Sequence, residues 1–333
     1  MSNTKQEIAI IGAGSWGTAL ALVLAHNKQC VRLWTYDKEQ AQRMHQERRN
    51  PLLPKIKLPA SIKITADLAE AVKNTRTILL VVPSHAFRSV LRQLKPLITS
   101  KMRLAWGTKG IEADTCALCH EVVQQELGKK IPLAVISGPS FALEVAQHIP
   151  TAVCVAGNNK NFTRDLAQLF HSSSFRVYQS SDLSGVEICG AVKNVIAIAA
   201  GILDGMQLGA NTHAALITRG LAEMARLSQA MGGASATVMG LAGLGDLILT
   251  CSDNLSRNRR FGQAIGSGLT VTQAQAKVKQ VVEGLMNAEQ VYQLARHHQV
   301  EMPIVEKVYQ ILYKKLSPKK AIQQLLSRPI AAQ

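Results

Sequence analysis

Short apolar runs, rich in β-branched residues, alternate with longer amphipathic stretches through the first half of the chain. The runs predict strands at residues 8–11, 31–34, 62–65, 77–82, 104–106, 133–136, 151–155 and 175–178. The amphipathic stretches predict helices at residues 18–26, 37–49, 67–73 and 86–94. Repeated strand–helix units of this length are typical of a doubly wound, mainly parallel sheet. Three prolines within residues 50–60 predict a loop there, without regular structure.

The strand pattern disappears from Ser180 onward, and helical periodicity replaces it. Polar residues that often begin helices lie near the expected starts, at Asp182, Thr212, Ser228 and Thr272. Glycines expected to interrupt the helices lie at Gly201, Gly233 and Gly245. The chain therefore divides into a Rossmann-like α/β domain over residues 1–185 and an all-helical domain over residues 186–333.

A surplus of basic residues is the unusual feature of the composition. The 333 residues include 38 basic and 22 acidic side chains, which give a net charge of +16. Such a charge attracts polyanions, and nucleic acid is one candidate. The basic residues are scattered, however, and aromatic residues, at 4%, do not interleave with them as base-stacking platforms would. Phosphorylated small molecules and a dinucleotide explain the charge without nucleic acid.

No segment has the length and apolar character of a membrane span. The most apolar run, residues 195–203, is interrupted by Gly201, and residues 1–7 are too polar for a signal peptide. Six cysteines lie mostly within apolar stretches, which is typical of free thiols in a reducing compartment. These features predict a cytoplasmic chain without membrane insertion.

A glycine-rich loop, Gly12-Ala13-Gly14-Ser15-Trp16-Gly17, joins the first predicted strand to the first predicted helix. In this context Gly12 allows a tight turn, Gly14 allows a pyrophosphate to approach the backbone, and Gly17 allows close packing of helix and strand. The helix N-terminus then presents N–H groups to the phosphates. The loop predicts a nicotinamide dinucleotide, bound by residues 12–17 including Ser15 and Trp16; a flavin nucleotide is the alternative.

The choice between NAD(H) and NADP(H) depends on residues after the second strand. Asp37, 20 residues after Gly17, is placed to bind the ribose hydroxyls of NAD, or else to cap the next helix. Tyr36 precedes it and is a further candidate cofactor contact. Arginines at 43, 48 and 49 are alternatively placed to meet a 2′-phosphate. These residues do not decide between NAD(H) and NADP(H).

Several further segments occur in a fixed order across nearly the whole chain. They are GAGSWGTALA (12–21), VVPSHAF (81–87), GTKGIE (107–112), SGPSFALEVA (137–146), GAVKNVIAIAAG (190–201), GLGDLILTC (243–251), SRNRRFG (256–262) and VVEG (281–284). Together they resemble the NAD(P)-dependent glycerol-3-phosphate dehydrogenase family, most closely its bacterial branch. The resemblance is specific because no single generic motif carries it.

The resemblance implies a reversible hydride transfer between C2 of sn-glycerol 3-phosphate and the nicotinamide ring. In bacteria this reaction usually reduces dihydroxyacetone phosphate and supplies the backbone of glycerophospholipids. The resemblance also favours a homodimer, as does the apolar helical second domain.

Lys193 is a lone cation in an otherwise apolar helical stretch. Burial there favours the neutral amine, which suits proton transfer at neutral pH, whereas a snorkelling lysine would only pack its stem. The resemblance assigns the catalytic lysine to this position. Asn194 and Asp246 are polar residues in apolar stretches, suited to orienting Lys193 and a substrate hydroxyl; a helix cap is the alternative for Asp246.

The tripeptide Ser256-Arg257-Asn258 offers a hydroxyl, a guanidinium and an amide in consecutive positions. An arginine binds phosphate through two parallel hydrogen bonds, so the tripeptide is the candidate phosphate site. Arg259 and Arg260, which follow, are better explained as a solvated basic segment.

Lys109, at the carboxyl edge of a predicted strand, is a candidate contact to both cofactor and substrate. Gly138 and Ser140 follow another strand and are further candidate substrate contacts. The resemblance implies additional cofactor contacts at Ala142, Arg257, Val281 and Glu283.

No metal site is expected. Cys116, Cys119 and His120 match a haem-attachment pattern, but that attachment takes place outside the cytoplasm, and the spacing places both cysteines on one helix face. The pair His297-His298 has no cysteine or carboxylate cluster close in sequence.

Two other functions fit part of these observations. A related two-domain dehydrogenase acting on a hydroxy acid would share the fold, but Ser256-Arg257-Asn258 would lack a phosphate to bind. A non-catalytic dinucleotide sensor would use the basic surface on DNA and would tolerate replacement of Lys193.

Overall fold

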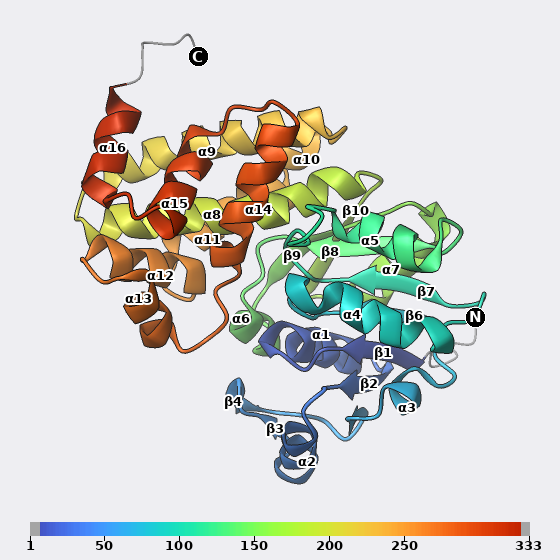
Figure 1. Cartoon of the computed structure of the whole chain (residues 1–333). Coiled ribbons are helices and arrows are strands. Elements are labelled where there is room, and N and C mark those ends of the chain that lie inside the picture. Colours follow the sequence, from blue (N-terminus) through green and yellow to red (C-terminus); the bar gives the residue numbers. More distant parts are fainter. Residues whose placement is uncertain (1–6, 328–333) are drawn as a thin grey trace. The chain divides into compact units, whose positions relative to one another are not determined.

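The computed structural model describes residues 7–327, which form two compact units. Within this range the first unit comprises residues 7–112 and 117–187, and the second comprises residues 113–116 and 188–327. Figure 1 shows their elements.

The first unit is built on an eight-stranded sheet. Its strands are β1 (Glu7–Ile11), β2 (Cys30–Trp34), β5 (Ile62–Thr65), β6 (Thr77–Leu80), β7 (Arg103–Trp106), β8 (Leu133–Ser137), β9 (Thr151–Gly157) and β10 (Phe175–Ser180). Their order is β10-β9-β8-β7-β6-β1-β2-β5, and every neighbouring pair is parallel except β8 and β9. The prediction of a doubly wound, mainly parallel sheet is confirmed.

Helices cover the sheet because parallel strands require crossover connections. They are α1 (Ser15–His26), α2 (Lys38–Glu47), α3 (Leu68–Val72), α4 (Ser84–Leu94), α5 (Cys119–Leu127), α6 (Ala142–Ala146) and α7 (Lys160–Phe170), with a 3₁₀ turn at Lys95–Leu97. The chain adds β2 on one side of β1, and later β6, β7 and β8 on the other. Right-handed crossovers in opposite directions place their helices on opposite faces. In agreement, α1 contacts α6 and α7, whereas α4 contacts α5.

The proline-containing segment after α2 is not an irregular loop. It forms an antiparallel pair, β3 (Arg49–Asn50) and β4 (Leu53–Lys57), so the prediction of a loop over residues 50–60 was wrong. A two-stranded ribbon has two edges, and an edge strand tolerates proline. Buried Leu53 and Leu58 hold the ribbon against the domain core.

The second unit is all-helical, as predicted. Its helices are α8 (Leu183–Gly205), which begins in the last residues of the first unit, α9 (Gly209–Ala230), α10 (Ser235–Val238), α11 (Asp246–Ser252), α12 (Arg257–Gly266), α13 (Val271–Val278), α14 (Glu283–His297), α15 (Pro303–Tyr313) and α16 (Pro318–Leu326). A π-helical turn, Leu241–Gly245, precedes α11. In residues 113–116 and 188–327 the structure contains no strand.

Some predicted helix boundaries were wrong. The carboxylate of Asp182 does accept the N–H of Gly185 at the start of α8, at 2.8 Å. Ser228, however, is buried within α9, and Gly201 lies inside α8. α13 begins one residue before Thr272, with Thr270 as its cap.

The glycines inside α8 allow a close approach to α12. A Cβ on Gly201 would lie 2.0 Å from the carbonyl oxygen of Arg259, and one on Gly205 would lie 2.3 Å from that of Gln263. On α12, Cβ atoms on Gly262 and Gly266 would lie 2.1 and 2.2 Å from carbonyl oxygens of α8. Any larger residue would force the two backbones apart, which explains why Gly201 does not end a helix.

Within residues 7–327, two helical stretches are long and apolar enough to cross a membrane, which corrects the expectation that none approaches that length. They are α8 and the stretch Ser235–Ser252. The most apolar window of α8 is completely buried inside the protein, as in the core helix of a globular domain. The corresponding window in Ser235–Ser252 is 39% buried.

Candidate functional site

The first unit gathers its candidate residues at one edge of the sheet. β1, β6, β7 and β8 are mutually parallel neighbours, so their carboxyl ends meet at the same edge. The glycine loop follows β1, Lys109 follows β7, and Gly138 follows β8. Ligands of doubly wound sheets bind at this edge, near the point where the strand order reverses. Here that point lies between β1 and β6.

The three glycines of the loop have different neighbours. Gly12 has φ +119°, and a Cβ on it would lie 2.4 Å from the carbonyl oxygen of Val81. A Cβ on Gly17 would lie 2.0 Å from the carbonyl oxygen of Gly12. A Cβ on Gly14, by contrast, would have no atom within 4 Å. The fold itself requires Gly12 and Gly17, whereas Gly14 leaves open space over the backbone, as an approaching pyrophosphate requires.

The N-terminus of α1 faces the same space. Gly14 is its N-cap, no side chain caps it, and its first turn holds no acidic residue. The positive end of the helix dipole is therefore not neutralised locally, which suits a bound phosphate. Ser15 is buried in this turn, and the indole nitrogen of Trp16 lies against Gly107, whose Cβ would be 2.8 Å away.

Two polar residues that the sequence did not single out fix the glycine loop. The side chain of Asn50 is fully buried and donates to the carbonyl oxygen of Ala13 at 2.9 Å. It also bonds the Thr18 hydroxyl at 2.6 Å. The side chain of Gln40 donates to the same carbonyl of Ala13 at 3.3 Å. Both are positioning residues. The signal in the sequence that could have identified Asn50 is its place as a polar residue directly before a proline of the β3–β4 segment.

The candidate residues for the ribose end of the cofactor follow β2 and differ in the contacts that they already make. The carboxylate of Asp37 accepts the N–H of Gln40 at 3.0 Å and caps α2. This is the helix-cap role that the sequence offered as the alternative to binding the ribose. Tyr36 is 84% exposed. Arg48 donates to backbone carbonyls that include that of Ile62, and Arg49 donates to that of Pro54.

Arg43 differs from these two arginines. It lies on α2 and is exposed, with no hydrogen bond or ion pair to any residue that the structure describes. It is the arginine of this group whose charge is not already used within the chain.

A second cluster forms where β7 and β8 end. The ammonium group of Lys109 donates to the carbonyl oxygen of Gly138 at 3.2 Å, and the hydroxyl of Ser140 donates to the same oxygen at 2.8 Å. Gly138 has φ +144°, and a Cβ there would lie 3.0 Å from the Cα of Val153, so glycine is required. Ala142 follows at the first position of α6. Lys109, Gly138 and Ser140 are therefore held together.

The second unit contains a buried ion pair. The ammonium group of Lys193, on α8, lies 2.6 Å from the carboxylate of Asp246, on α11. It also donates to the hydroxyl of Thr250 at 2.9 Å. Lys193 is 6% exposed and Asp246 1%. The carboxylate favours the charged ammonium, whereas burial alone favours the neutral amine, so the two effects oppose each other. Sequence reasoning missed Thr250, which lies one helical turn after Asp246.

A chain of amides lies next to this pair. The side chain of Asn258, on α12, donates to the side-chain oxygen of Asn194 at 2.9 Å. Its own oxygen accepts the N–H of Gly284 at 2.9 Å. The amide nitrogen of Asn194 is buried and has no hydrogen-bond partner within residues 7–327. Such a group is costly unless a ligand or water satisfies it, so it marks a place for an acceptor.

The phosphate candidate starts a helix, as expected. The hydroxyl of Ser256 caps α12 by accepting the N–H of Arg259 at 3.2 Å. Arg257 is half-buried; burial lowers the pKa of its guanidinium, and the charge of Glu283 opposes that effect. Glu283 is the first residue of α14, and Val281, just before it, is 50% exposed.

Arg259 does not belong to a solvated segment. Its guanidinium lies 2.8 Å from the carboxylate of Asp204 and bonds the side chain of Asn254. The expectation for Arg259 was therefore wrong, whereas Arg260 is exposed.

The residues of the haem-like pattern serve other purposes. Cys116 precedes α5 and has φ +56°, so the two cysteines do not share a helix face as expected. The ring of His120 bonds the carboxylate of Glu187 at 2.5 Å. Within residues 7–327, no group of three His, Cys, Asp or Glu side chains could hold a metal ion.

A doubly wound sheet with this glycine loop, continued by an all-helical unit with a buried lysine, defines a two-domain dinucleotide-dependent dehydrogenase. Two models of one family match the chain: the NAD-dependent glycerol-3-phosphate dehydrogenase N-terminus over residues 7–163, and its C-terminus over residues 182–323.

Individual relatives agree with these matches. The chain is 53% identical to glycerol-3-phosphate dehydrogenase [NAD(P)+] of Coxiella burnetii (strain RSA 331 / Henzerling II) over 329 residues, 98% of each chain. It is 51% identical to that of Escherichia coli O1:K1 / APEC over 330 residues, 98% of this chain and 97% of the relative. The crystal structure of the Coxiella burnetii enzyme superimposes with a TM-score of 0.95 over 97% of this chain and 99% of that one.

The chain belongs to the NAD-dependent glycerol-3-phosphate dehydrogenase family, and it is an NAD(P)-dependent oxidoreductase. The resemblance carried by its motifs is thereby confirmed.

Proposed function

We propose that this chain catalyses the reversible NAD(P)-dependent conversion of dihydroxyacetone phosphate to sn-glycerol 3-phosphate, for glycerophospholipid synthesis. The observation that carries the proposal is the buried cluster of Lys193, Asp246 and Thr250 in the helical unit. An apolar core does not retain an ammonium group without a role that repays its burial. The names of the 51–53% identical relatives supply the substrate.

The first unit binds the pyrophosphate of the cofactor. When bound, the nicotinamide supplies the hydride for reduction and accepts it in the reverse reaction. Gly14 and the N-terminus of α1 bind the pyrophosphate, because that space is open and faces an uncapped helix end. The other residues proposed to touch the cofactor are Gly12, Ser15, Trp16, Gly17, Tyr36, Lys109, Ala142, Arg257, Val281 and Glu283.

Lys193 transfers the proton. In reduction its ammonium group gives a proton to the C2 oxygen as the hydride arrives at C2, and the amine left behind is reprotonated from water. In oxidation the neutral amine accepts the proton of the C2 hydroxyl. Asp246 and Thr250 hold the Nζ atom in place, and the Asp246 carboxylate favours the charged form that the reduction needs.

Each unit offers residues to the substrate. In the second unit Arg257 binds the phosphate, with Ser256 as a further donor. In the first unit the residues proposed to touch the substrate are Lys109, Gly138 and Ser140. The unpaired amide nitrogen of Asn194 donates to a substrate oxygen, which satisfies it.

Asn258 acts differently from its neighbours in the tripeptide. Both ends of its side chain already bond Asn194 and Gly284, so we infer that it mainly positions Asn194 for the substrate.

The direct test is oxidation of NADH and NADPH, side by side, with dihydroxyacetone phosphate, unphosphorylated dihydroxyacetone and 2-keto acids. Turnover should be largest with the phosphorylated ketone, and its absence would overturn the proposal. Arg257→Ala should raise KM for dihydroxyacetone phosphate about 100-fold, because a charged phosphate contact of about 2.7 kcal/mol is lost. It should change the weak reaction of dihydroxyacetone far less. Equal losses on both substrates would mean that Arg257 acts through the cofactor or the fold and not on the substrate's phosphate.

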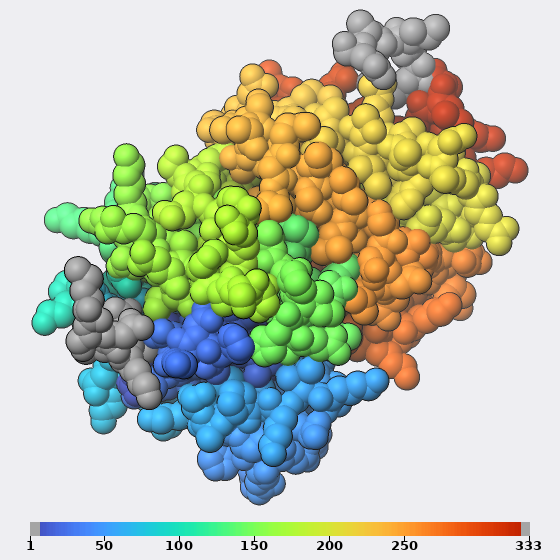
Figure 2. Space-filling model, turned by 180° about the vertical axis from the view of Figure 1, so that it is seen from behind, coloured from blue at the N-terminus to red at the C-terminus, as the bar shows by residue number. Residues whose placement is uncertain are grey.

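We also propose that the enzyme is a homodimer in the cytoplasm, without membrane insertion or a nucleic-acid partner. None of its six cysteines forms a disulfide, as in a reducing compartment. Apolar side chains are exposed on the second unit, including Met239 at 61% and Ile248 at 46%. Figure 2 shows α9 (yellow) and the following helices (orange) side by side on the surface of this unit. Exposed apolar side chains are common in protein interfaces.

Light scattering of variants tests the dimer. Met239→Glu should shift the protein toward monomer, whereas Tyr178→Glu, at an exposed apolar position of β10, should leave its mass unchanged. A monomeric wild type would contradict the dimer.

A further inference from the structure

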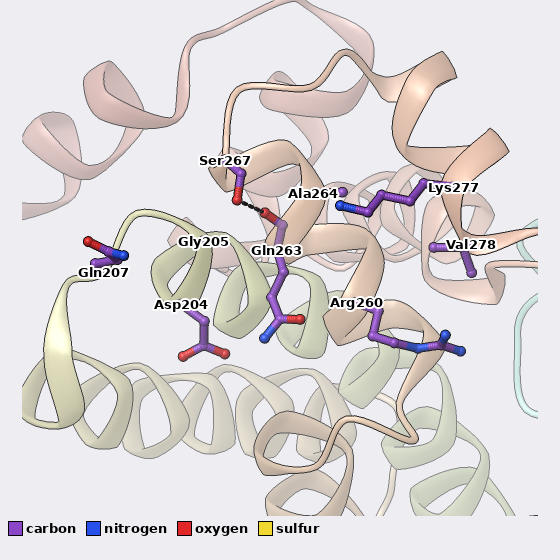
Figure 3. A pocket seen from close by; sticks show the side chains of 9 residues that line it. All are labelled: Asp204, Gly205, Gln207, Arg260, Gln263, Ala264, Ser267, Lys277 and Val278. Atoms are coloured by element: carbon purple, nitrogen blue, oxygen red, sulfur yellow. Dashed lines mark hydrogen bonds between the residues drawn. The ribbon is translucent and has the colours of Figure 1, made fainter.

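The second unit contains a cavity that no candidate catalytic or substrate residue lines. It has a volume of about 460 Å³ and lies between the end of α8, α12 and α13. Its polar lining is Asp204, Gln207, Arg260, Gln263, Ser267 and Lys277. Figure 3 shows Lys277 extending from α13 toward α12, which carries Arg260 and Gln263. The volume falls within the ~300–1,000 Å³ typical of small-molecule sites.

Two positive charges at this cavity have no oppositely charged partner within residues 7–327, and that of Arg260 also acts on the charge of Arg257. Arg260 and Lys277 have no hydrogen bond or ion pair to any residue in the described range 7–327. Arg259 shows the contrast, because its guanidinium is engaged by Asp204 at 2.8 Å and by Asn254. That pair also neutralises Asp204, the carboxylate that lines the cavity. The cavity therefore has a positive balance, which favours an anion.

The remaining lining identifies the kind of anion. The amide of Gln263 has no partner among the residues that the structure describes, and the Ser267 hydroxyl bonds only the Gln263 carbonyl oxygen. A guanidinium, an ammonium and an amide match the several acceptor oxygens of a phosphate. The apolar lining is small, consisting of Ala264 and Val278, so the ligand needs no large apolar body.

We propose that this cavity binds a small phosphorylated molecule at a site separate from that of the substrate. Arg260 and Lys277 provide the charge, and the amide of Gln263 provides a further hydrogen bond. The inference goes beyond the proposed reaction, since none of these residues has a role in it.

Calorimetric titration with inorganic pyrophosphate tests the site. The starting protein is Arg257→Ala saturated with NADPH, in which the proposed substrate-phosphate contact is removed, the proposed pyrophosphate site at Gly14 is filled and the cavity is intact. Adding Arg260→Gln and Lys277→Gln should weaken its binding of pyrophosphate at least tenfold. Adding Lys129→Gln and Lys130→Gln instead removes the same two charges from exposed positions of the first unit, and should change binding less than twofold.

Several results would overturn the site. They are no binding of pyrophosphate by the Arg257→Ala protein at millimolar concentration, unchanged binding after Arg260 and Lys277 are replaced, and an equal loss in the Lys129 and Lys130 control. Citrate that binds as tightly as pyrophosphate would overturn the phosphate class.

The double variant Arg260→Gln/Lys277→Gln, otherwise wild type, separates this inference from the proposed function. Both side chains are exposed, so it should fold, melt and reduce dihydroxyacetone phosphate as the wild type does. Loss of that turnover would place the two residues in the substrate site and overturn a separate one.

Discussion

The two units hold their candidate residues by different means. In the first unit they lie on loops at the carboxyl edge of parallel strands, where the backbone path and glycines such as Gly12 and Gly138 set their positions. In the second unit they lie on helices and are held by side chains, as in the pair of Lys193 and Asp246. The first arrangement depends on close backbone contacts, and the second depends on buried charge.

This difference changes what a substitution does. At the sheet edge, an added methyl group acts by steric overlap, either with protein atoms or with the bound ligand. In the helical unit, loss of one charge leaves the other buried and unpaired, which costs more than the contact itself contributes. The predictions below test each half of this comparison.

The largest effect is expected at Lys193. Lys193→Met keeps the length of the side chain and removes the proton donor, so kcat should fall about 10³-fold, within the range for general acid–base catalysis. Thr250→Val removes one hydrogen bond to Nζ and should lower kcat much less, about tenfold. Steady-state kinetics with dihydroxyacetone phosphate measure both.

Cofactor affinity is the control for Lys193→Met. Fluorescence titration with NADPH should give a Kd within about twofold of wild type, because Lys193 has no proposed contact to the cofactor. A fall in kcat of less than tenfold would contradict the catalytic assignment.

The next largest effect separates two glycines of one loop. Gly12→Ala should lower the free energy of unfolding by about 3 kcal/mol, because its Cβ would lie 2.4 Å from the Val81 carbonyl oxygen at a φ of +119°. Gly14→Ala should change stability by less than about 0.5 kcal/mol, since its Cβ meets nothing.

Gly14→Ala should instead weaken NADPH binding about tenfold or more, because the methyl group takes the space of the pyrophosphate. Urea unfolding and cofactor titration of both variants make the comparison. Normal cofactor binding by Gly14→Ala would mean that the dinucleotide does not approach this loop.

The sequence was informative where function depends on the local backbone path. The strand, the glycine loop and the helix follow one another directly, so their geometry can be derived from residues 8–26 alone. The parallel order of the strands follows from the alternation of elements, and it places Lys109 near Gly138 although 29 residues separate them.

Contacts between distant helix faces were harder to derive. Lys193 and Asp246 are 53 residues apart, and Asn194 and Asn258 are 64 apart, so no local pattern joins them. Gly201 was misread as a helix end because a close helix contact and a helix end both favour glycine. Asn50 was missed because its partner, Ala13, lies in another element.

A smaller effect is expected at the ribose end of the cofactor. Arg43 is the arginine of its group without a partner in the described chain, so it is available to a 2′-phosphate. Arg43→Gln should raise KM for NADPH about fivefold, as expected for an exposed charge contact of about 1 kcal/mol, and leave KM for NADH nearly unchanged. Arg49→Gln is the matched control, because Arg49 already bonds the Pro54 carbonyl. Equal effects on the two cofactors would exclude Arg43 as the selective residue.

The smallest effect concerns pH and the pair of His120 and Glu187 in the first unit. Burial lowers the pKa of His120, but the hydrogen bond and charge of Glu187 outweigh it, so the pKa is raised above 6.5. A raised histidine pKa stabilises the fold below about pH 6.5, and this contribution is lost as the pH rises through the folded-state value.

His120→Gln should therefore be less stable than wild type by about 1 kcal/mol at pH 5.5, and the difference should shrink toward pH 9. Urea unfolding at both pH values measures it. His297→Gln, at an exposed position on α14, should match wild type within about 0.5 kcal/mol at each pH. A difference for His120→Gln that grows with pH would mean that the imidazole is buried in its neutral form. The first unit would then be stabilised at this position by packing and not by charge.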